Sequence, residues 1–303
     1  VNQAPYVDQG IAVFTSDGHR VFAFHPTTGQ QLWTRQLAPP GDPALSRLPP
    51  SNIVGVDDLI IVSGYNLYAL DRATGAMRWT YEGNDEVTSA SGVALNGSTV
   101  YASGGTRYLS AIDIRTGALR WRADLGERPF SPLVVNGRVY VGAKRRVDPD
   151  DDFGFLGIGH LWALDAETGA VLWRTLIGNP EIPNLGGVVA RPGLFGNVLV
   201  VAGSAGHIVG LDRETGAVLW EQHRANEACH AGIVAALDSV AVVAGITSAV
   251  LGLDPLTGRI LWERSIGSGT TGMWSTSGDV VLITNGRVVA VDATGSIRWR
   301  FPP

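Results

Sequence analysis

The stretch that decides the fold is Leu67 to Trp79, which reads Leu-Tyr-Ala-Leu-Asp-Arg-Ala-Thr-Gly-Ala-Met-Arg-Trp, because the chain repeats this pattern seven times. The frame consists of a small residue, any residue, Asp, two residues, Thr-Gly, three residues and Trp, and the five middle copies follow it fully. The seven tryptophans of the frame, each four residues after a Gly that follows a Thr, are Trp33, Trp79, Trp121, Trp173, Trp220, Trp262 and Trp299. Such regular copies indicate a repeat architecture.

Each copy predicts the same local structure. The apolar run Leu67–Leu70 is typical of a short strand covered on both faces. Asp71 ends it, and its carboxylate can accept backbone N–H bonds in a tight turn, while Gly75 supplies the left-handed conformation. We expect the Trp79 indole to lie over a neighbouring sheet, with its N–H donated to an acceptor there. The small residue two positions before Asp, here Ala69, predicts a close backbone approach.

The repeat period predicts the whole fold. Successive tryptophans of the frame are 37 to 52 residues apart, and one period holds four strands, predicted in the second repeat at Asn52–Val56, Leu59–Ser63, Leu67–Leu70 and Ala76–Tyr81. We therefore expect an all-β fold, a seven-bladed β-propeller of four-stranded antiparallel blades, as a single domain over residues 1–303. The alternative, an open β-solenoid, favours shorter coils and ladders of identical residues, which the sequence lacks.

The two end repeats depart from the frame. The first blade is predicted at Val1–Asp8, Ile11–Thr15, Val21–Phe24 and Gln30–Leu37, with His25 where Asp belongs. In the last repeat Asp292 is one residue closer to its glycine, Gly295. Terminal repeats are commonly atypical, so we interpret both departures as structural.

Composition excludes several classes of protein. The net charge is −5, and Lys144 is the only lysine among 23 basic residues, which argues against nucleic-acid binding. No apolar run reaches the roughly 18 residues needed to cross a bilayer, so we expect no transmembrane segment. No signal peptide is visible at Val1, as in a chain already processed. The single cysteine, Cys229, excludes an internal disulfide, and we expect a monomer.

The irregular segments point to one functional face. They are the links between blades and the insertion in blade four, at Ala38–Pro50, Lys144–His160, Ile177–Gly187, Gln222–Gly232 and Ser265–Met273. In a four-stranded blade these segments lie at one face and the Asp-Thr-Gly turns at the other. We interpret the repeated face as scaffold and the variable face as the functional one.

The frame resembles the PQQ-like repeat, which is found in quinoprotein dehydrogenases and in non-enzymatic relatives. Those relatives include BamB-type outer-membrane assembly proteins, to which the chain is most similar, and the sensor domains of some bacterial kinases. The resemblance covers the whole chain and implies the propeller fold. It also implies a bacterial protein of the periplasm or cell envelope.

The PQQ-like family contains two branches that differ in activity, the dehydrogenases and their non-enzymatic relatives. The dehydrogenases hold PQQ against an adjacent Cys–Cys disulfide, with a calcium ion and an Asp base, and they use eight blades and a longer chain. Cys229 alone cannot form that disulfide, and no catalytic residue carries over. We therefore expect no enzyme and no PQQ, but a protein-interaction scaffold with envelope or outer-membrane assembly partners. The alternative is a ligand-sensing or degenerate quinoprotein propeller that holds a flat cofactor in its channel.

The insertion in blade four carries a candidate calcium site. Asp148, Asp150 and Asp152 alternate near Gly154, and oxygen ligands at such spacing can wrap Ca²⁺. Against this, Phe153 stands where an EF-hand-type loop has its glycine, and no Glu closes the loop. The alternative is a solvated acidic loop.

The same insertion carries a candidate partner site. Phe153, Phe155, Leu156 and Ile158 are apolar side chains spaced by glycines. Apolar groups on a long loop indicate a partner or a lid. The alternative is that this tip folds back onto blade four or over the channel.

Two further groups of residues are weaker candidates for a site. Glu227, Cys229 and His230, with His223 close by, could form a soft-metal or thiol site, although a lone Cys is more often a small buried apolar residue. Trp274, preceded by Met273 at the start of the innermost strand of blade seven, could stack on a flat cofactor, with Arg128 and Glu86 lining the same opening. Packing into the core and surface ion pairs are the alternatives. No catalytic set of residues is present.

Overall fold

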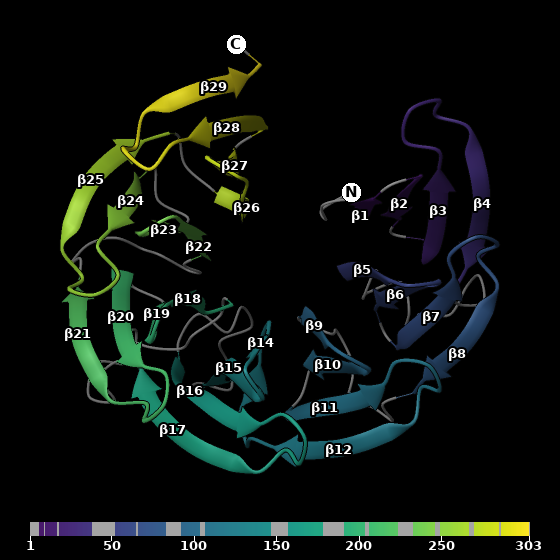
Figure 1. Ribbon diagram of the computed structural model, residues 1–303, viewed down its shortest axis with the longest axis horizontal. Helices are drawn as coiled ribbons and strands as arrows, with labels where there is room; N and C mark the ends of the chain where they lie inside the picture. Colours follow the sequence, from purple (N-terminus) through teal and green to yellow (C-terminus); the bar gives the residue numbers. More distant parts are fainter. Residues whose placement is uncertain are drawn as a thin grey trace. The chain divides into compact units, whose positions relative to one another are not determined.

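The structure is a computed structural model. It describes residues 6–8, 10–16, 18–37, 52–64, 66–82, 92–103, 107–146, 157–177, 191–203, 206–223, 233–245, 249–266, 270–284 and 286–302. The chain divides into two compact units, an N-terminal unit of Val1–Val134 and a C-terminal unit of Val135–Pro303. Each unit is built from consecutive antiparallel sheets (Figure 1).

The N-terminal unit contains three four-stranded sheets, each with its strands in chain order. Their strands are β1 (Tyr6–Asp8), β2 (Ile11–Thr15), β3 (Arg20–Phe24) and β4 (Gln31–Gln36); β5 (Asn52–Val56), β6 (Leu59–Ser63), β7 (Leu67–Asp71) and β8 (Met77–Tyr81); and β9 (Gly92–Asn96), β10 (Thr99–Ser103), β11 (Tyr108–Asp113) and β12 (Leu119–Asp124).

The next sheet spans the boundary between the units and comprises β13 (Arg128–Pro129), β14 (Leu133–Val135), β15 (Arg138–Arg146), β16 (Gly157–Asp165) and β17 (Val171–Ile177). Three more four-stranded sheets follow in the C-terminal unit. Their strands are β18 (Gly193–Phe195), β19 (Val198–Ala202), β20 (His207–Asp212) and β21 (Val218–His223); β22 (Ile233–Leu237), β23 (Val240–Ala244), β24 (Ala249–Leu253) and β25 (Ile260–Ser265); and β26 (Thr270–Ser275), β27 (Val280–Thr284), β28 (Arg287–Val291) and β29 (Ile297–Phe301).

These seven antiparallel sheets confirm the predicted fold class, a seven-bladed β-propeller. In the second repeat, two of the four predicted strands have the predicted bounds, and the other two differ by one residue at one end. The agreement has a simple cause. The glycine and aspartate turns that separate the strands are explicit in the sequence, so each strand has little freedom in where it ends.

The core lies between consecutive sheets. The second strands β6, β10, β19 and β23 are buried along their whole length. In the N-terminal unit, Val13 and Val21 of the first sheet pack with Ile60 and Leu70 of the second. The second sheet packs against the first on one face and against the third on the other, so its inner strand β7 is apolar on both faces, as the Leu67–Leu70 run predicted.

The insertion in blade four is shorter than predicted. The sequence placed it at Lys144–His160, but β15 continues to Arg146 and β16 begins at Gly157, with Lys144 paired to Gly159 and Arg146 to Gly157. The run Lys144–Arg146 thus continues the strand that it was expected to end.

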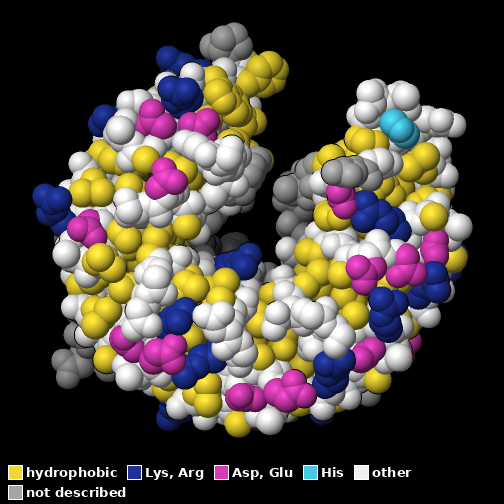
Figure 2. Space-filling view, viewed as in Figure 1, with side chains coloured by type: hydrophobic (Ala, Val, Ile, Leu, Met, Phe, Trp, Pro, Cys, Tyr) yellow, Lys and Arg dark blue, Asp and Glu magenta, His cyan; other side chains and the backbone are white. Residues whose placement is uncertain are grey.

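The described residues contain no helix that is long and apolar enough to cross a membrane. On the face shown in Figure 2, acidic and basic side chains lie beside one another rather than gathered by sign. This mixture agrees with ion pairs such as Arg107–Asp124 and Arg138–Glu214.

Candidate functional site

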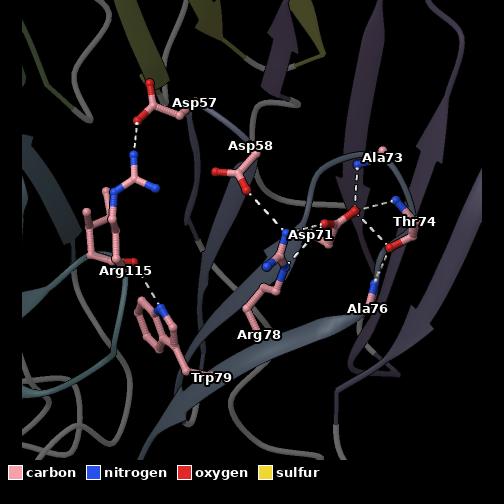
Figure 3. A network of polar contacts seen from close by, with 10 residues as sticks. Asp57, Asp58, Asp71, Ala73, Thr74, Ala76, Arg78, Trp79 and Arg115 are labelled. Atoms are coloured by element: carbon pink, nitrogen blue, oxygen red, sulfur yellow. Dashed lines mark hydrogen bonds and ion pairs between the residues drawn. The ribbon is translucent and has the colours of Figure 1, made fainter.

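The repeated turn is a closed hydrogen-bond network, shown for the second blade in Figure 3. The Asp71 Oδ1 accepts the backbone N–H groups of Ala73 and Thr74, at 3.1 and 2.8 Å, and the Thr74 hydroxyl at 2.8 Å. The Asp71 Oδ2 accepts two bonds from the Arg78 guanidinium, at 2.7 and 3.2 Å. The Thr74 hydroxyl and Arg78 together lower the pKa of Asp71 to about 2. This carboxylate is ionised and fully bonded, so it is poorly suited to act as a base.

The other copies repeat the network. Asp113, Asp165, Asp212 and Asp254 each accept a backbone N–H two residues on, and each has a lowered pKa. In the first blade the His25 Nδ1 accepts the N–H groups of Thr27 and Thr28 instead, each at 3.3 Å. In the last blade the turn is one residue shorter, and the Gly295 N–H bonds the Asp292 carbonyl. These contacts support the interpretation of this turn as structural.

Five indoles of the frame reach the next sheet. The Trp79 Nε1 donates to the Ile114 carbonyl at 2.9 Å, and Figure 3 draws a dashed line from the Trp79 indole nitrogen. Equivalent bonds join Trp33 to Arg72, Trp173 to Arg213, Trp220 to Pro255 and Trp262 to Ala293, at 2.8 to 3.1 Å. In every case the acceptor lies in the Asp-Thr-Gly turn of the following blade, which confirms the predicted role of the tryptophan.

The glycine of each turn makes room for that indole. A Cβ placed at Gly75, Gly117, Gly216, Gly258 or Gly295 would come within 3.0 Å of the tryptophan of the preceding blade. All five glycines have φ between +69° and +77°. Space and backbone conformation therefore both require glycine at this position.

In two copies the small residue two positions before Asp is a glycine that is closely approached. At Gly210 and Gly252 the atoms nearest to an added Cβ belong to Trp220 and Trp262, the cross-strand partners in the same sheet. The close approach is thus to an indole and not to a neighbouring backbone. Trp220 is held between Gly210 of its own blade and Gly258 of the next.

A cavity of about 290 Å³ opens in the N-terminal unit where the first and second sheets meet. Its lining includes Ile11 and Leu32 with the charged Asp58, Asp71 and Arg72. These charges are already paired, since Arg72 bonds Asp8 at 2.8 Å and Arg78 bonds both Asp58 and Asp71. The cavity lies between two blades and is lined by apolar residues and by charged residues that already form ion pairs. Such a lining is poorly suited to acid–base chemistry.

Most predicted site residues lie outside the described part of the chain. These are the candidate calcium ligands Asp148, Asp150 and Asp152, the apolar Phe153, Phe155 and Leu156, and also Glu86, Glu227, Cys229 and His230. Ile158 lies in β16, where it pairs with Arg145. The calcium, partner and thiol sites stay predictions.

Two cofactor candidates, Arg128 and Trp274, lie in described strands. Arg128 lies in β13 with its guanidinium 5.6 Å from the centre of the Phe130 ring. Trp274 lies near the end of β26 and not at its start, because that strand begins at Thr270, paired with Thr284. Met273 packs against the core of the last two sheets.

The structure adds one pair of histidines that the sequence did not suggest. His207 and His223 are cross-strand partners with ring centres 6.4 Å apart, and the His207 Nε2 lies 3.7 Å from Glu221. Burial lowers the pKa of His207, although Glu221 opposes the shift. Only the register of β20 and β21 brings these residues together, so no sequence motif could have found them. No group of three or more His, Cys, Asp or Glu side chains in the described ranges is arranged to hold a metal ion.

Comparisons with known proteins agree on the repeat. A family model described as "Outer membrane protein assembly factor BamB" matches residues 1–89 and 66–300. BamB of Xanthomonas campestris pv. campestris is 30% identical over 143 residues, which are 46% of this chain and 33% of that protein. Quinohemoprotein alcohol dehydrogenase ADH IIB of Pseudomonas putida is 30% identical over 139 residues, which are 40% of this chain and 19% of the enzyme. The chain thus aligns with a third or less of the length of either protein.

A solved structure shows the same fold. The crystal structure of BamB from Moraxella catarrhalis superposes with a TM-score of 0.75 at 20% identity, covering 99% of this chain and 87% of that chain. At this identity the likeness concerns the arrangement of strands and not the activity.

Proposed function

Because this chain belongs to the family of the outer membrane protein assembly factor BamB, we propose that it is a non-catalytic β-propeller that binds another protein in the bacterial cell envelope. The proposal is carried by pairs of exposed apolar side chains on the last strands of three consecutive blades, β17, β21 and β25. These pairs are Val171 and Leu172, Val218 and Leu219, and Ile260 and Leu261.

All six side chains are between 38 and 51% exposed. In each pair the register with the neighbouring strand shifts, so the leucine is the extra residue of a β-bulge beside its valine or isoleucine. Single exposed apolar residues are ordinary, whereas the same pair on three successive blades of one unit favours an interaction surface.

The fold does not require apolar residues at these positions. Arg78, Arg120 and Arg298 stand directly before Trp79, Trp121 and Trp299, where Leu172, Leu219 and Leu261 stand before their tryptophans. Arg78 and Arg120 there bond the aspartate of the turn. Blades therefore fold with arginine directly before the tryptophan. Packing within a blade does not by itself explain why Leu172, Leu219 and Leu261 stand at this position.

The same strands offer backbone groups to a partner. β21 and β25 are the last strands in their sheet orders, as is β17 in its sheet. An edge strand of this kind can pair with an extended segment of another chain, while side-chain contacts give specificity. We therefore expect the partner to present an extended, partly apolar segment.

The test replaces the three leucines by arginine, the residue that precedes the tryptophan in three other blades. The variant Leu172→Arg/Leu219→Arg/Leu261→Arg is compared with the wild type in pull-downs from a bacterial envelope extract. The matched control is Leu32→Arg, the same position in β4, outside the row of three. We expect the wild type and the control to retain a common envelope protein and the triple variant to lose it.

Thermal unfolding of all three proteins is measured in parallel, because binding losses count only if the fold is kept. Equal capture by the triple variant would contradict the proposed surface. Failure of the wild type to retain any envelope protein would contradict the proposed function itself.

A ligand-binding propeller is the second candidate, favoured by the similarity to a quinohemoprotein dehydrogenase. The chain does not fit the PQQ site of that branch, because its single cysteine cannot supply the adjacent pair. We expect PQQ added to the purified protein to keep the absorbance spectrum of the free compound. A shifted spectrum, or turnover of an alcohol or sugar, would favour the second candidate.

The proposal carries two expectations about the native protein. Cell fractionation should place it in the envelope, as the family suggests, and light scattering should give the mass of a monomer. A cytoplasmic location would contradict the proposed partner class.

A further inference from the structure

The cavity between the first and second sheets corresponds to a place that an arginine side chain fills elsewhere in the molecule. Ile11, which lines the cavity, is the first residue of β2, and Arg138 is the first residue of β15. Each follows a hairpin glycine of positive φ, Gly10 or Gly137. Each also begins the strand that pairs with the one leading into the repeated turn, β3 or β16. Ile11 and Arg138 are therefore equivalent residues of two blades.

Arg138 shows what that place holds in blade four. Its Nη1 donates to the carbonyls of Arg213 and Glu214 in the turn of blade five, at 3.3 and 3.1 Å, and its Nη2 lies 2.6 Å from the Glu214 carboxylate. The Arg213 carbonyl also accepts the Trp173 indole. Two neighbouring carbonyls and a carboxylate thus bind one guanidinium, whose donors lie in a fixed plane that suits several acceptors at once.

The turn of blade two presents the corresponding acceptors to the cavity. Arg72 follows the turn aspartate as Arg213 does, and its carbonyl likewise accepts the indole of the preceding blade, Trp33. The next residue, Ala73, lines the cavity, and its carbonyl accepts no hydrogen bond from the described residues. Asp58 also lines the cavity and adds a carboxylate. The same kinds of acceptor therefore meet here without an arginine from blade one.

The wall that blade one contributes is apolar and leaves the space open. Ile11 carries no donor, and a Cβ added at Gly10 would have no atom within 4 Å. Leu32, which is 45% exposed, adds a second apolar side chain to the lining. Such side chains suit the methylene stem of an arginine, whose apolar part packs while its charged head reaches polar groups.

The charged groups at the cavity carry one negative charge in excess. Arg78 is shared between the carboxylates of Asp58 and Asp71, and Figure 3 draws dashed lines to both. Arg72 bonds Asp8 at 2.8 Å. Among the lining residues and their ion-pair partners, three carboxylates thus meet two guanidinium groups, which gives a net charge of −1. A bound cation would balance this charge.

We propose that this cavity binds the side chain of an arginine presented by another polypeptide. The guanidinium donates to the carbonyls of Arg72 and Ala73 and pairs with Asp58, as Arg138 does with the turn of blade five. Its methylene stem lies against the apolar wall of blade one. The Asp58 side chain is 57% exposed, so the cavity is accessible to a side chain that enters from solvent. The occupant is specified by a contact that this molecule already makes between two of its own blades.

The test titrates the intact protein with an N-acetylated and C-amidated Gly-Gly-Arg-Gly-Gly peptide, while NMR follows the backbone amide signals of Gly10 and Ala73. Matched peptides carry citrulline, which has the shape of arginine without its charge, or lysine, which has the charge without the planar group. We expect the arginine peptide to shift both signals and to bind about tenfold more tightly than either matched peptide.

Two variants at neighbouring residues separate binding in the cavity from general effects of charge. Asp58→Asn removes the carboxylate and should weaken binding of the arginine peptide about tenfold. The fold accepts asparagine there, because Asn197 stands at the equivalent position of blade five, with its carbonyl bonded in the same way. Asp57→Asn makes the same change in charge but removes an ion pair to Arg115, outside the cavity lining. This control should bind the arginine peptide like the wild type.

A third variant supplies the occupant from within the chain. Ile11→Arg gives blade one the residue that blade four has at this position, so its guanidinium should fill the cavity. We expect the peptide to leave the Gly10 and Ala73 signals of this variant unshifted. Thermal unfolding is measured in parallel, and if the variant does not fold, the comparison of Asp58→Asn with Asp57→Asn decides.

The proposal is overturned if the arginine peptide shifts neither signal of the wild type, or if the citrulline peptide binds as tightly. It is equally overturned if Asp58→Asn binds the arginine peptide as well as Asp57→Asn does. These outcomes do not depend on the proposed envelope partner, which is tested at other residues.

Discussion

At the scale of single residues, the bonds of the turn aspartate explain why the first blade can form the same turn with a different residue at this position. The Asp71 carboxylate accepts bonds from two N–H groups, a hydroxyl and a guanidinium. In the first blade His25 keeps only the two backbone bonds, and these are longer. The essential function is therefore acceptance of the backbone N–H groups, and the charge serves the additional contact with arginine.

The lowered pKa of Asp71 predicts a pH dependence of stability. Its pKa falls from 3.8 to about 2 on folding, so the ionised carboxylate stabilises the fold above pH 3.8, and this stabilisation is lost as the pH falls through 2. We expect Asp71→Asn to lower the melting temperature by a few degrees at pH 6 and by much less at pH 2. Calorimetry from pH 6 to pH 2 measures the difference.

The matched control is Asp57→Asn, which removes an ion pair to Arg115 whose side chains are both 68% exposed. Asparagine also tolerates the positive φ of this position. Because such pairs contribute little, its melting curve should follow that of the wild type. An Asp71→Asn deficit that is the same at both pH values would contradict the role assigned to the carboxylate.

At the scale of elements, blades are joined by a tryptophan of one blade and a glycine of the next. Gly258 and Gly286 have nearly the same φ, +73° and +74°, but only Gly258 faces an indole, that of Trp220. Gly286→Ala should cost about 1–2 kcal/mol of unfolding free energy from backbone strain alone. Gly258→Ala should cost about 1–3 kcal/mol more because its methyl group overpacks the interface. Denaturant unfolding measures the loss of unfolding free energy in each variant. Equal losses would show that the Trp220 indole moves aside for the added methyl group at no cost.

Two tryptophans of the frame should differ in how much they contribute to stability. Trp262→Phe removes the bond to the Ala293 carbonyl, and we expect it to lower the free energy of unfolding by about 1–3 kcal/mol. Trp299→Phe removes an exposed indole and should change it by less than about 0.5 kcal/mol. Similar losses in both variants, measured in urea, would mean that Trp299 is covered in solution.

Strand bounds show where prediction from sequence succeeds and fails. β5 and β6 end at glycine and aspartate turns and could be predicted to the residue. The extension of β15 through Arg146 could not, because it depends on pairing with glycines of a strand more than ten residues away. Where a turn ends a strand, the local sequence determines the last residue of that strand. Where no turn follows, pairing with the neighbouring strand determines it.

At the scale of the whole molecule, the seven sheets were predictable because one frame of Asp, Thr-Gly and Trp recurs seven times. The roles of Asp71, Gly75 and Trp79 followed from their chemistry in that frame. The contact between His207 and His223 did not, because it arises from strand register alone. The exposure of Leu172, Leu219 and Leu261 could not be predicted from the sequence either, because it depends on how the blades assemble.

The calcium hypothesis concerns a segment outside the described residues, 147–156, and is tested on the intact protein. If Asp148, Asp150 and Asp152 wrap Ca²⁺ through their oxygens, titration calorimetry should detect binding heat that Asp150→Ala removes. The Asp238→Ala variant, with its change in a turn of another blade, should keep it. Absence of heat in the wild type would identify the segment as a solvated acidic loop.

The contact between tryptophan and turn has a direction along the chain. The acceptor carbonyl always follows its indole, by 39, 35, 40, 35 and 31 residues in the five described pairs. On the ribosome, a blade that has just been synthesised therefore exposes its indole until the next 31 to 40 residues have emerged. The growing end of the nascent chain carries one bare aromatic ring at each stage, and a chaperone that recognises such rings would bind there until the following blade folds.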